Sequence, residues 1–256
     1  SVHLPLNEAL PCGTARGGEL LATEPGGARG LFASAAAGDF KLYNCKAAFV
    51  ISGMASKRLL SPGAGAIRDL ALLDAQGQAR FDDPLIEAAP IVGFAPELLP
   101  GDGTLRVFVP TSVELVHNGA DGRPAHLRFV GTDQPFAPLD YLLEQTDELL
   151  ERNPPYAITL DYILDGNADH LRIEMSVTSE APASDPNNTP ARPALAWLDG
   201  GTLIRHFGGQ SDNDLDFSGI TSRIAETKMS WYGLIAGDTE AAYGFFDAKT
   251  TGLSAL

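Results

Sequence analysis

Histidines are the side chains of this sequence best suited to acid–base chemistry near neutral pH. His117, His126, His170 and His206 stand singly, outside any HxH, HExxH or Cys/His cluster, so their spacing predicts no zinc site. His206 lies in TLIRHFGG, between an arginine and a phenylalanine, and is the candidate for a general acid or base. A lone histidine is more often structural than catalytic, so we predict no catalytic residues beyond this one candidate.

Two of these histidines fall on opposite arms of one predicted hairpin, at 113–117 and 125–130. Asn-Gly and Asp-Gly pairs between the arms mark the reversal. Such a hairpin can bring His117 and His126 together across it. The simpler interpretation is a pair of surface imidazoles.

Three aspartates at alternate positions form a candidate cation site in QSDNDLDFSG. They are Asp212, Asp214 and Asp216. Hard cations such as Ca²⁺ bind clustered carboxylate oxygens on a turn. The EF-hand pattern is not met, because Phe217 stands where glycine is needed and Arg223 where the bidentate glutamate should be. Two interpretations stay open, a Ca²⁺ site and an acidic solvated loop, and no other cofactor is predicted.

The sequence has two cysteines, too few for a disulfide scaffold. Cys12 and Cys45 either form one bridge, which would pin the N-terminal arm onto the strand around Cys45, or are separate buried thiols. Because disulfides persist in oxidising compartments, we predict the bridge if the protein is exported.

Aromatic residues are concentrated in the C-terminal third of the chain. Trp197, Trp231 and Tyr232 are candidate ligand-binding residues together with His206, because aromatic faces stack on sugars and a sheet concavity is a natural place for this. Packing in the core is the alternative role for most of the aromatic residues.

Composition excludes two classes of partner. Among 256 residues, 33 are acidic and 18 are basic, giving a net charge of −15. Nucleic acids and anionic membrane surfaces attract clustered Lys and Arg, so neither is a predicted partner. No apolar run approaches the roughly 20 residues that span a bilayer, so membrane insertion is not predicted.

Alternation of apolar and polar residues dominates the chain. YAITLDYILDGNADHLRIEMSVTS (156–179) alternates on both arms around DGN, which is typical of a hairpin whose turn needs positive φ. Similar patterns predict strands in 38–53, 67–83 and 105–133, whereas the prolines of 84–100 predict only short extended pieces. One segment changes period, and its leucine stripe predicts a short helix near 139–151.

The predicted fold is mainly β, a large antiparallel two-sheet β-sandwich with that one short helix. Residues 1–37 are rich in Gly, Ala and Pro and predict an irregular N-terminal arm. Residues 38–256 predict a single β-sandwich domain. The apolar pattern runs to Leu256 without a polar tail, so we expect the natural domain to continue beyond this residue.

Two stretches resemble known families. HLRIEMSVTSEAP resembles the L-x-I-x-x-x-V-T-N strand of galactose-mutarotase-like β-supersandwich proteins, with Ser179 in place of the asparagine and ALAWLDGG in the place of their aromatic segment. GDFKLYNCKAAFVISG, followed by GAGAIRDLALLD, resembles the N-terminal module of large secreted or lipid-anchored bacterial proteins. Catalytic mutarotase-like enzymes use a His and a carboxylate in the concave face, and ALAWLDGG has no His.

The resemblance implies a supersandwich fold and a secreted, periplasmic or cell-surface location. We expect a non-catalytic module with a binding or structural role toward a glycan or a protein partner. One alternative is a carbohydrate-active enzyme, a mutarotase, epimerase or lyase relative acting in the concave face. A second alternative is a self-assembling surface subunit, which would form a homo-oligomer.

Overall fold

The computed structural model describes residues 3–30, 32–56, 64–83, 85–94, 106–135, 156–179, 193–201, 204–209, 216–217, 231–236 and 242–246. Within these ranges every helix-or-strand element is a β-strand. Each pair of neighbouring strands runs antiparallel. The predicted mainly β, antiparallel class is therefore confirmed. The helix predicted near 139–151 lies outside the described residues.

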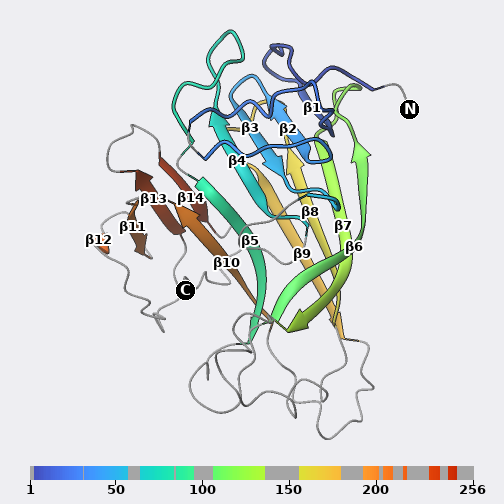
Figure 1. The fold of residues 1–256 in the computed structure, drawn as a ribbon, viewed down its shortest axis with the longest axis vertical. Helices are drawn as coiled ribbons and strands as arrows, with labels where there is room; N and C mark the ends of the chain where they lie inside the picture. The colour runs from blue at the N-terminus through green and yellow to red at the C-terminus, as the bar shows by residue number, and fades with distance from the viewer. Residues whose placement is uncertain are drawn as a thin grey trace, which may run out of the picture.

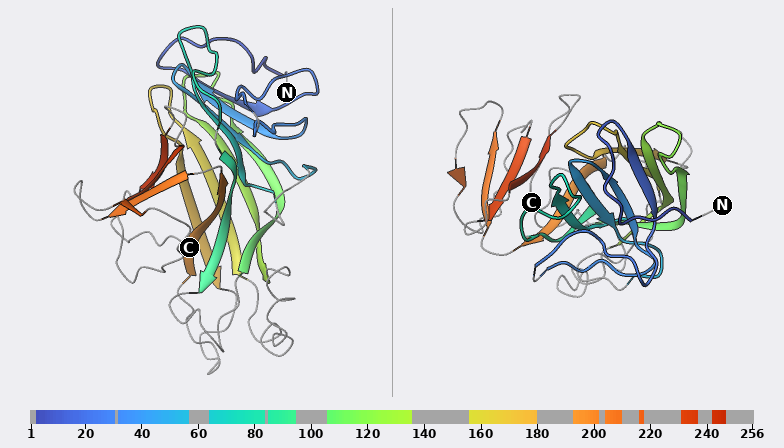
Figure 2. Two further views of the ribbon diagram at one scale, coloured as in Figure 1. Left: turned by 60° about the vertical axis from the view of Figure 1, so that its left-hand side comes forward. Right: turned by 90° about the horizontal axis from the view of Figure 1, so that it is seen from above.

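The described strands form a sheet of ten and a sheet of four, which lie side by side in Figures 1 and 2. In the larger sheet β1 to β9 follow one another in chain order and β10 pairs with β5. Its strands are β1 Ala15–Glu19, β2 Phe40–Asn44, β3 Ala47–Ile51, β4 Ile67–Leu72, β5 Leu85–Phe94, β6 Arg106–His117, β7 Ala125–Pro135, β8 Tyr156–Leu164, β9 Arg172–Ser179 and β10 Pro193–Gly201. The smaller sheet, ordered β12-β11-β13-β14, contains β11 Ile204–Gly209, β12 Asp216–Phe217, β13 Trp231–Ala236 and β14 Ala242–Phe246.

Strand β5 is the point at which the larger sheet divides into two layers. β10 pairs along the length of β5, from Leu85 to Phe94. On the other edge, β4 pairs at Ala88 and β6 pairs at Ile91 and Val92. β4 and β6 therefore share one edge of β5, and the strands on either side of it diverge. The first layer turns back over the second, so that β1 approaches β6 and β7 while β2 approaches β7 and β8.

The main hydrophobic core fills the space between these layers. Phe129, on β7, is fully buried and meets two rings edge to face, with centroids 6.4 Å from Phe40 and 6.1 Å from Tyr162. The hydroxyl of Tyr162 donates a hydrogen bond to the Gly65 carbonyl, so its polar atom is satisfied inside the core. Other core residues are Leu42, Ile51, Ile67, Phe108, Leu127, Ile158 and Leu160.

The predicted hairpins are confirmed. The stretch 156–179 forms β8 and β9, with Leu160 opposite Met175, and the inward residues of β8 are buried as the alternation requires. Residues 38–53 form β2 and β3, and the arms predicted at 113–117 and 125–130 belong to the longer strands β6 and β7. Strands β13 and β14 of the smaller sheet also pair with each other.

The expectation that prolines restrict 84–100 to short extended pieces is wrong for its first half. β5 runs for 10 residues through Pro90. On the edge of β5 that β4 and β6 share, the paired positions are Ala88, Ile91 and Val92, so this edge has no paired position at Pro90. Proline lacks an N–H and is tolerated in a strand where no ladder bond is required of it.

Gly166 has a different role from the one predicted for the DGN turn. The glycines of the described residues with positive φ do not include Gly166. A Cβ at this position would instead collide with the carbonyl group of Gly13 and with the amide of Thr14. Glycine is needed there because two chain segments pass one another closely, and not because the turn has a left-handed conformation.

The N-terminal segment covers the outer face of the first layer. Leu6 and Leu20 are buried against β2, β3 and β4 in a second apolar cluster. The other members of this cluster are Tyr43, Ala48, Val50, Ala71, Leu73 and Ala79. Residues 3–30 thus contribute both a strand, β1, and the apolar cover of a sheet that is buried on two faces.

We predict that Phe129→Ala lowers the free energy of unfolding by about 3–5 kcal/mol, because it removes a fully buried ring and leaves a cavity between the layers. Val130→Ala is the matched control. Val130 is the next residue of β7 and its residue exposure is 40%, so the change should cost under about 1 kcal/mol. Urea unfolding of both variants measures the difference, and equal losses would contradict the layered core.

Candidate functional site

The residues predicted to bind a ligand are divided between the two sheets. Trp197 belongs to β10, opposite Pro90 of β5, whereas His206 is on β11 and Trp231 and Tyr232 are on β13. In the smaller sheet His206 pairs with Leu234 and Gly208 pairs with Tyr232. The register therefore places His206 and Tyr232 on one face and Trp231 on the other.

The proposed Ca²⁺ ligands are only partly within the described residues. Asp212 and Asp214 lie outside them, and Asp216 is in β12, paired with Phe207. Among the described ranges, no group of three or more His, Cys, Asp or Glu side chains is placed to hold a metal ion. The Ca²⁺ site remains a prediction.

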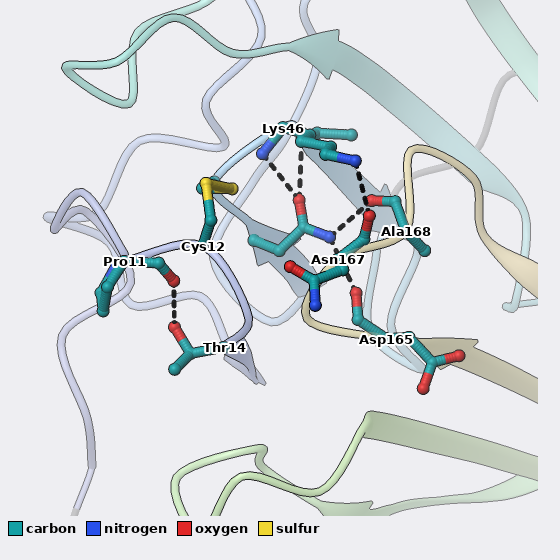
Figure 3. Close-up of a disulfide and its surroundings, with 10 residues drawn as sticks. Pro11, Cys12, Thr14, Lys46, Asp165, Asn167 and Ala168 are labelled. Atoms are coloured by element: carbon teal, nitrogen blue, oxygen red, sulfur yellow. Dashed lines mark hydrogen bonds between the residues drawn. A yellow bond between two sulfur atoms is a disulfide. The ribbon is translucent and has the colours of Figure 1, made fainter.

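The two cysteines are joined in a junction between three chain segments (Figure 3). Cys12, in the N-terminal segment, is bonded to Cys45, in the turn between β2 and β3. The adjacent Asn44 amide donates hydrogen bonds to the carbonyls of Asp165 and Ala168, at 2.8 and 2.7 Å. Lys46 Nζ donates to the Asn167 carbonyl at 2.7 Å. The loop between β8 and β9 is thereby held against the start of the chain.

A pocket of about 280 Å³ lies beside this junction. Both cysteines line it, together with Tyr43, Asn44 and the turn that follows β4. The Asn44 amide in its wall is already bonded to the β8–β9 loop, and its oxygen accepts from the amides of Lys46 and Ala47. The side-chain amide of Asn44 is therefore already used by the hydrogen bonds of the junction.

Lys41 is a buried cation under the N-terminal segment. Its Nζ atom donates to the Leu6 carbonyl at 2.8 Å and lies 4.6 Å from the ring centroid of Tyr43. Burial lowers the pKa of Lys41 to about 8, although the carboxylate of Glu24 acts in the opposite direction. The ammonium group fastens the covering segment to β2.

Two buried aspartates hold neighbouring backbone segments. Asp69, on β4, accepts hydrogen bonds from the amides of Ser34 and Ala35, each at 2.8 Å. Asp83 accepts from the amides of Leu70 and Leu85, each at 2.9 Å. Burial raises the pKa of Asp83 to about 7 against the effect of those two hydrogen bonds. Each carboxyl group is thus committed to the backbone.

A further polar arrangement lies on the face of β6 to β9 that points away from the core, which we call the outer sheet face. Leu127 and Phe129 of β7 point into the core, and the residues that alternate with them point outward. The register aligns one charged residue from each strand in a row across this face. The row is Glu114, Arg128, Asp161 and Glu174.

Asp161 is the centre of this row. Its Oδ1 atom lies 2.6 Å from Nε2 of His126 and 2.7 Å from Nε of Arg128, and its Oδ2 lies 3.2 Å from the second guanidinium nitrogen. Burial alone would raise the pKa of Asp161, but the hydrogen bonds from Arg128 and His126 outweigh it, and the pKa is lowered. The aspartate is therefore ionised and accepts from both neighbours.

His117 and His126 occupy directly paired positions at the end of the β6–β7 hairpin. Their ring centroids are 6.3 Å apart, so the hairpin brings the two histidines together. Arg123, in the turn between the strands, approaches Nε2 of His117 at 3.2 Å and also pairs with Asp121. Two imidazoles, two carboxylates and two guanidinium groups therefore gather at this end of the outer sheet face.

Sequence reasoning missed Asp161 and Arg128 as partners of His126. Arg128 follows His126 by two residues, so alternation alone places both on one face of β7. Asp161 required the register between β7 and β8, in which Arg128 is opposite Asp161. The pairing of two separate hairpins carries that information, and no local pattern in either one reveals it.

This chain matches no protein-family model, no curated protein and no solved structure. No helix among the described residues has the length and apolar character needed to cross a membrane.

We predict that the exported protein, denatured without reductant, contains no titratable thiol, because Cys12 and Cys45 are bonded. The bond closes a loop across a sequence separation of 33 residues, so the variant with serine at both positions should lose about 3–4 kcal/mol of unfolding free energy in the chain-entropy model. Reduced wild-type protein is the control and should lose as much. Two free thiols in the unreduced protein would contradict the bridge.

We predict that Lys41 makes the protein more stable as pH rises above about 8. The folded state then releases this proton, while the unfolded state keeps it up to an ordinary pKa of 10.5. Because the unfolded state binds more protons in this window, the free energy of unfolding increases with pH, by about 1.4 kcal/mol for each unit of pKa difference.

Urea unfolding between pH 7 and 10.5 measures this effect of Lys41 across the interval between its two pKa values. Lys41→Met should abolish the rise. Lys46→Met is the matched control, because Lys46 donates its hydrogen bond to Asn167 at an exposed position, and its slope should equal that of the wild type. A wild-type slope in Lys41→Met would contradict the assignment.

Proposed function

We propose that this chain is a non-catalytic β-sandwich module of a secreted or surface bacterial protein, with a binding or structural role toward a glycan or protein partner. The observation that carries the proposal is how the buried polar side chains are used. Lys41, Asn44, Asp69 and Asp83 each bond to the backbone of another segment, at distances of 2.7–2.9 Å. These bonds join loops and covering segments to the sheet.

Such bonding suits a rigid scaffold. Acid–base catalysis on a sugar needs two groups with separated pKa values that face one pocket. Burial brings the pKa of Lys41 to about 8 and that of Asp83 to about 7, and these two groups hold the Leu6 carbonyl and the Leu70 and Leu85 amides respectively. Their hydrogen bonds give each of them a structural task.

The disulfide supports the proposed location. A bond between Cys12 and Cys45 is characteristic of proteins that fold in an oxidising compartment, such as the periplasm or the cell exterior. The resemblance of the sequence to galactose-mutarotase-like supersandwich proteins, and to modules of secreted bacterial proteins, points in the same direction and stays a prediction.

A carbohydrate-active enzyme is the second candidate. One observation favours it: the register of the smaller sheet places His206 on the same face as Tyr232. A general acid or base and an aromatic residue on one face of a sheet are residue types that sugar-processing sites use.

One experiment separates the two candidates. Turnover and equilibrium binding are measured on a panel of aldoses and uronate-containing polysaccharides, for the wild type and for His206→Ala. His170→Ala is the matched control, because the side chain of His170 is 51% exposed and pairs with Asp169. A binding module should show no turnover by any of the three proteins. His206→Ala should cost at most about 1 kcal/mol of stability.

The enzyme hypothesis predicts the opposite pattern. Turnover by the wild type and by His170→Ala, lost in His206→Ala, would overturn the proposed function and establish His206 as the acid–base residue.

A further inference from the structure

The side-chain cluster at the end of the β6–β7 hairpin supports an inference that is independent of the proposed function. We infer that His117 and His126 together bind one divalent transition-metal ion, and that Asp161 positions the His126 ring. The two histidines face each other in register, with ring centroids 6.3 Å apart. Imidazole nitrogens are ligands for Cu²⁺, Ni²⁺ and Zn²⁺.

The His126 ring is held in the tautomer that a metal requires. An ionised carboxylate only accepts hydrogen bonds, so Nε2 of His126 donates its proton to Oδ1 of Asp161 across 2.6 Å. In the neutral ring the lone pair is then on Nδ1. A carboxylate that holds the far nitrogen of a metal-binding imidazole fixes its orientation and increases its basicity. Asp161 is in turn held by Arg128.

The His117 ring also presents a lone pair. Its Nε2 atom lies 3.2 Å from a guanidinium nitrogen of Arg123. A guanidinium group can only donate, so Nε2 of His117 is the acceptor and carries no proton. A metal ion would take the place of Arg123 at this atom. That exchange is inexpensive, because the Arg123 side chain is 57% exposed and keeps its pairing with Asp121.

The spacing suits a two-ligand site completed by water. With metal–nitrogen distances of about 2.0–2.1 Å, one ion reaches both rings once the half-buried His117 rotates to turn its Nε2 toward Nδ1 of His126. Two imidazoles supply the protein ligands, and solvent fills the other positions. Because solvent fills the other positions, the protein imposes little geometric preference among metals. The order of binding then follows intrinsic affinity, so Cu²⁺ should bind more tightly than Ni²⁺ or Zn²⁺.

Arg123 distinguishes a metal site from a purely structural pair of histidines. If the imidazoles only pack against each other, removing Arg123 leaves any metal affinity unchanged or lowers it. If Nε2 of His117 is a ligand, Arg123 competes with the metal for the same lone pair. Arg123→Ala should then strengthen metal binding.

The test is calorimetric titration of the full chain with Cu²⁺, and separately with Zn²⁺, together with electron paramagnetic resonance of the Cu²⁺ complex. All proteins carry His3→Ala, because a histidine in the third position can chelate Cu²⁺ with a free amino terminus. We expect one site with two imidazole nitrogens in the copper spectrum. His117→Ala and His126→Ala should each weaken binding at least tenfold.

Two further variants report on the surrounding groups. Asp161→Asn should weaken binding by about 10-fold, at the low end of the range for such supporting carboxylates, because the amide oxygen still accepts from His126. Arg123→Ala should tighten it. His170→Ala, which alters an exposed histidine paired with Asp169, is the matched control and should leave the affinity unchanged.

The inference fails if the parent protein gives no Cu²⁺ or Zn²⁺ titration above that of the His117→Ala/His126→Ala double variant. It also fails if the copper spectrum lacks two imidazole nitrogens, a measurement made on the parent alone that holds even if a histidine variant does not fold. Loss of binding in His170→Ala with no loss in the other two histidine variants would place the ion elsewhere and equally overturn it.

Discussion

A β-strand has two hydrogen-bonding edges, and β5 divides one of its edges between β4 and β6 while β10 occupies the other. Two strands that leave the same edge at different points cannot stay in one flat sheet. The first four strands and the strands from β6 to β9 therefore become the two layers of a sandwich, although they belong to one continuous sheet. The buried Phe129, Phe40 and Tyr162 lie where the layers meet.

That layered arrangement gives the polar residues their tasks. The first layer has apolar residues on both faces, so its outer face must be covered by the N-terminal segment, and this cover is secured by Lys41 and Asp69. The second layer has one face in the core, and its outer face is free to carry a charged row around Asp161. The first layer is thus buried on both faces and the second layer on one. This difference accounts for the different polar residues that the two layers carry.

The hairpins could be predicted from the sequence because alternation is local, as in β8 and β9. The course of β5 through Pro90 could not, because it depends on which positions of its edges have partners. Leu6 and Leu20 were hidden in a segment rich in Gly and Pro that has no periodicity. At the candidate site, the meeting of His117 and His126 follows from one hairpin. Asp161 needed the register of a second hairpin against the first.

The junction of Figure 3 also has a consequence for the order of folding. The cysteines are 33 residues apart, whereas Asn44 and its acceptor Asp165 are 121 apart. Bringing the ends of the longer loop together costs about 1 kcal/mol more in chain entropy. During synthesis, too, Asn44 emerges long before its partner exists. Once the chain is in an oxidising compartment, the sulfur bond can close before the second layer has folded, and the early strands then present a preformed edge on which the later hairpins assemble.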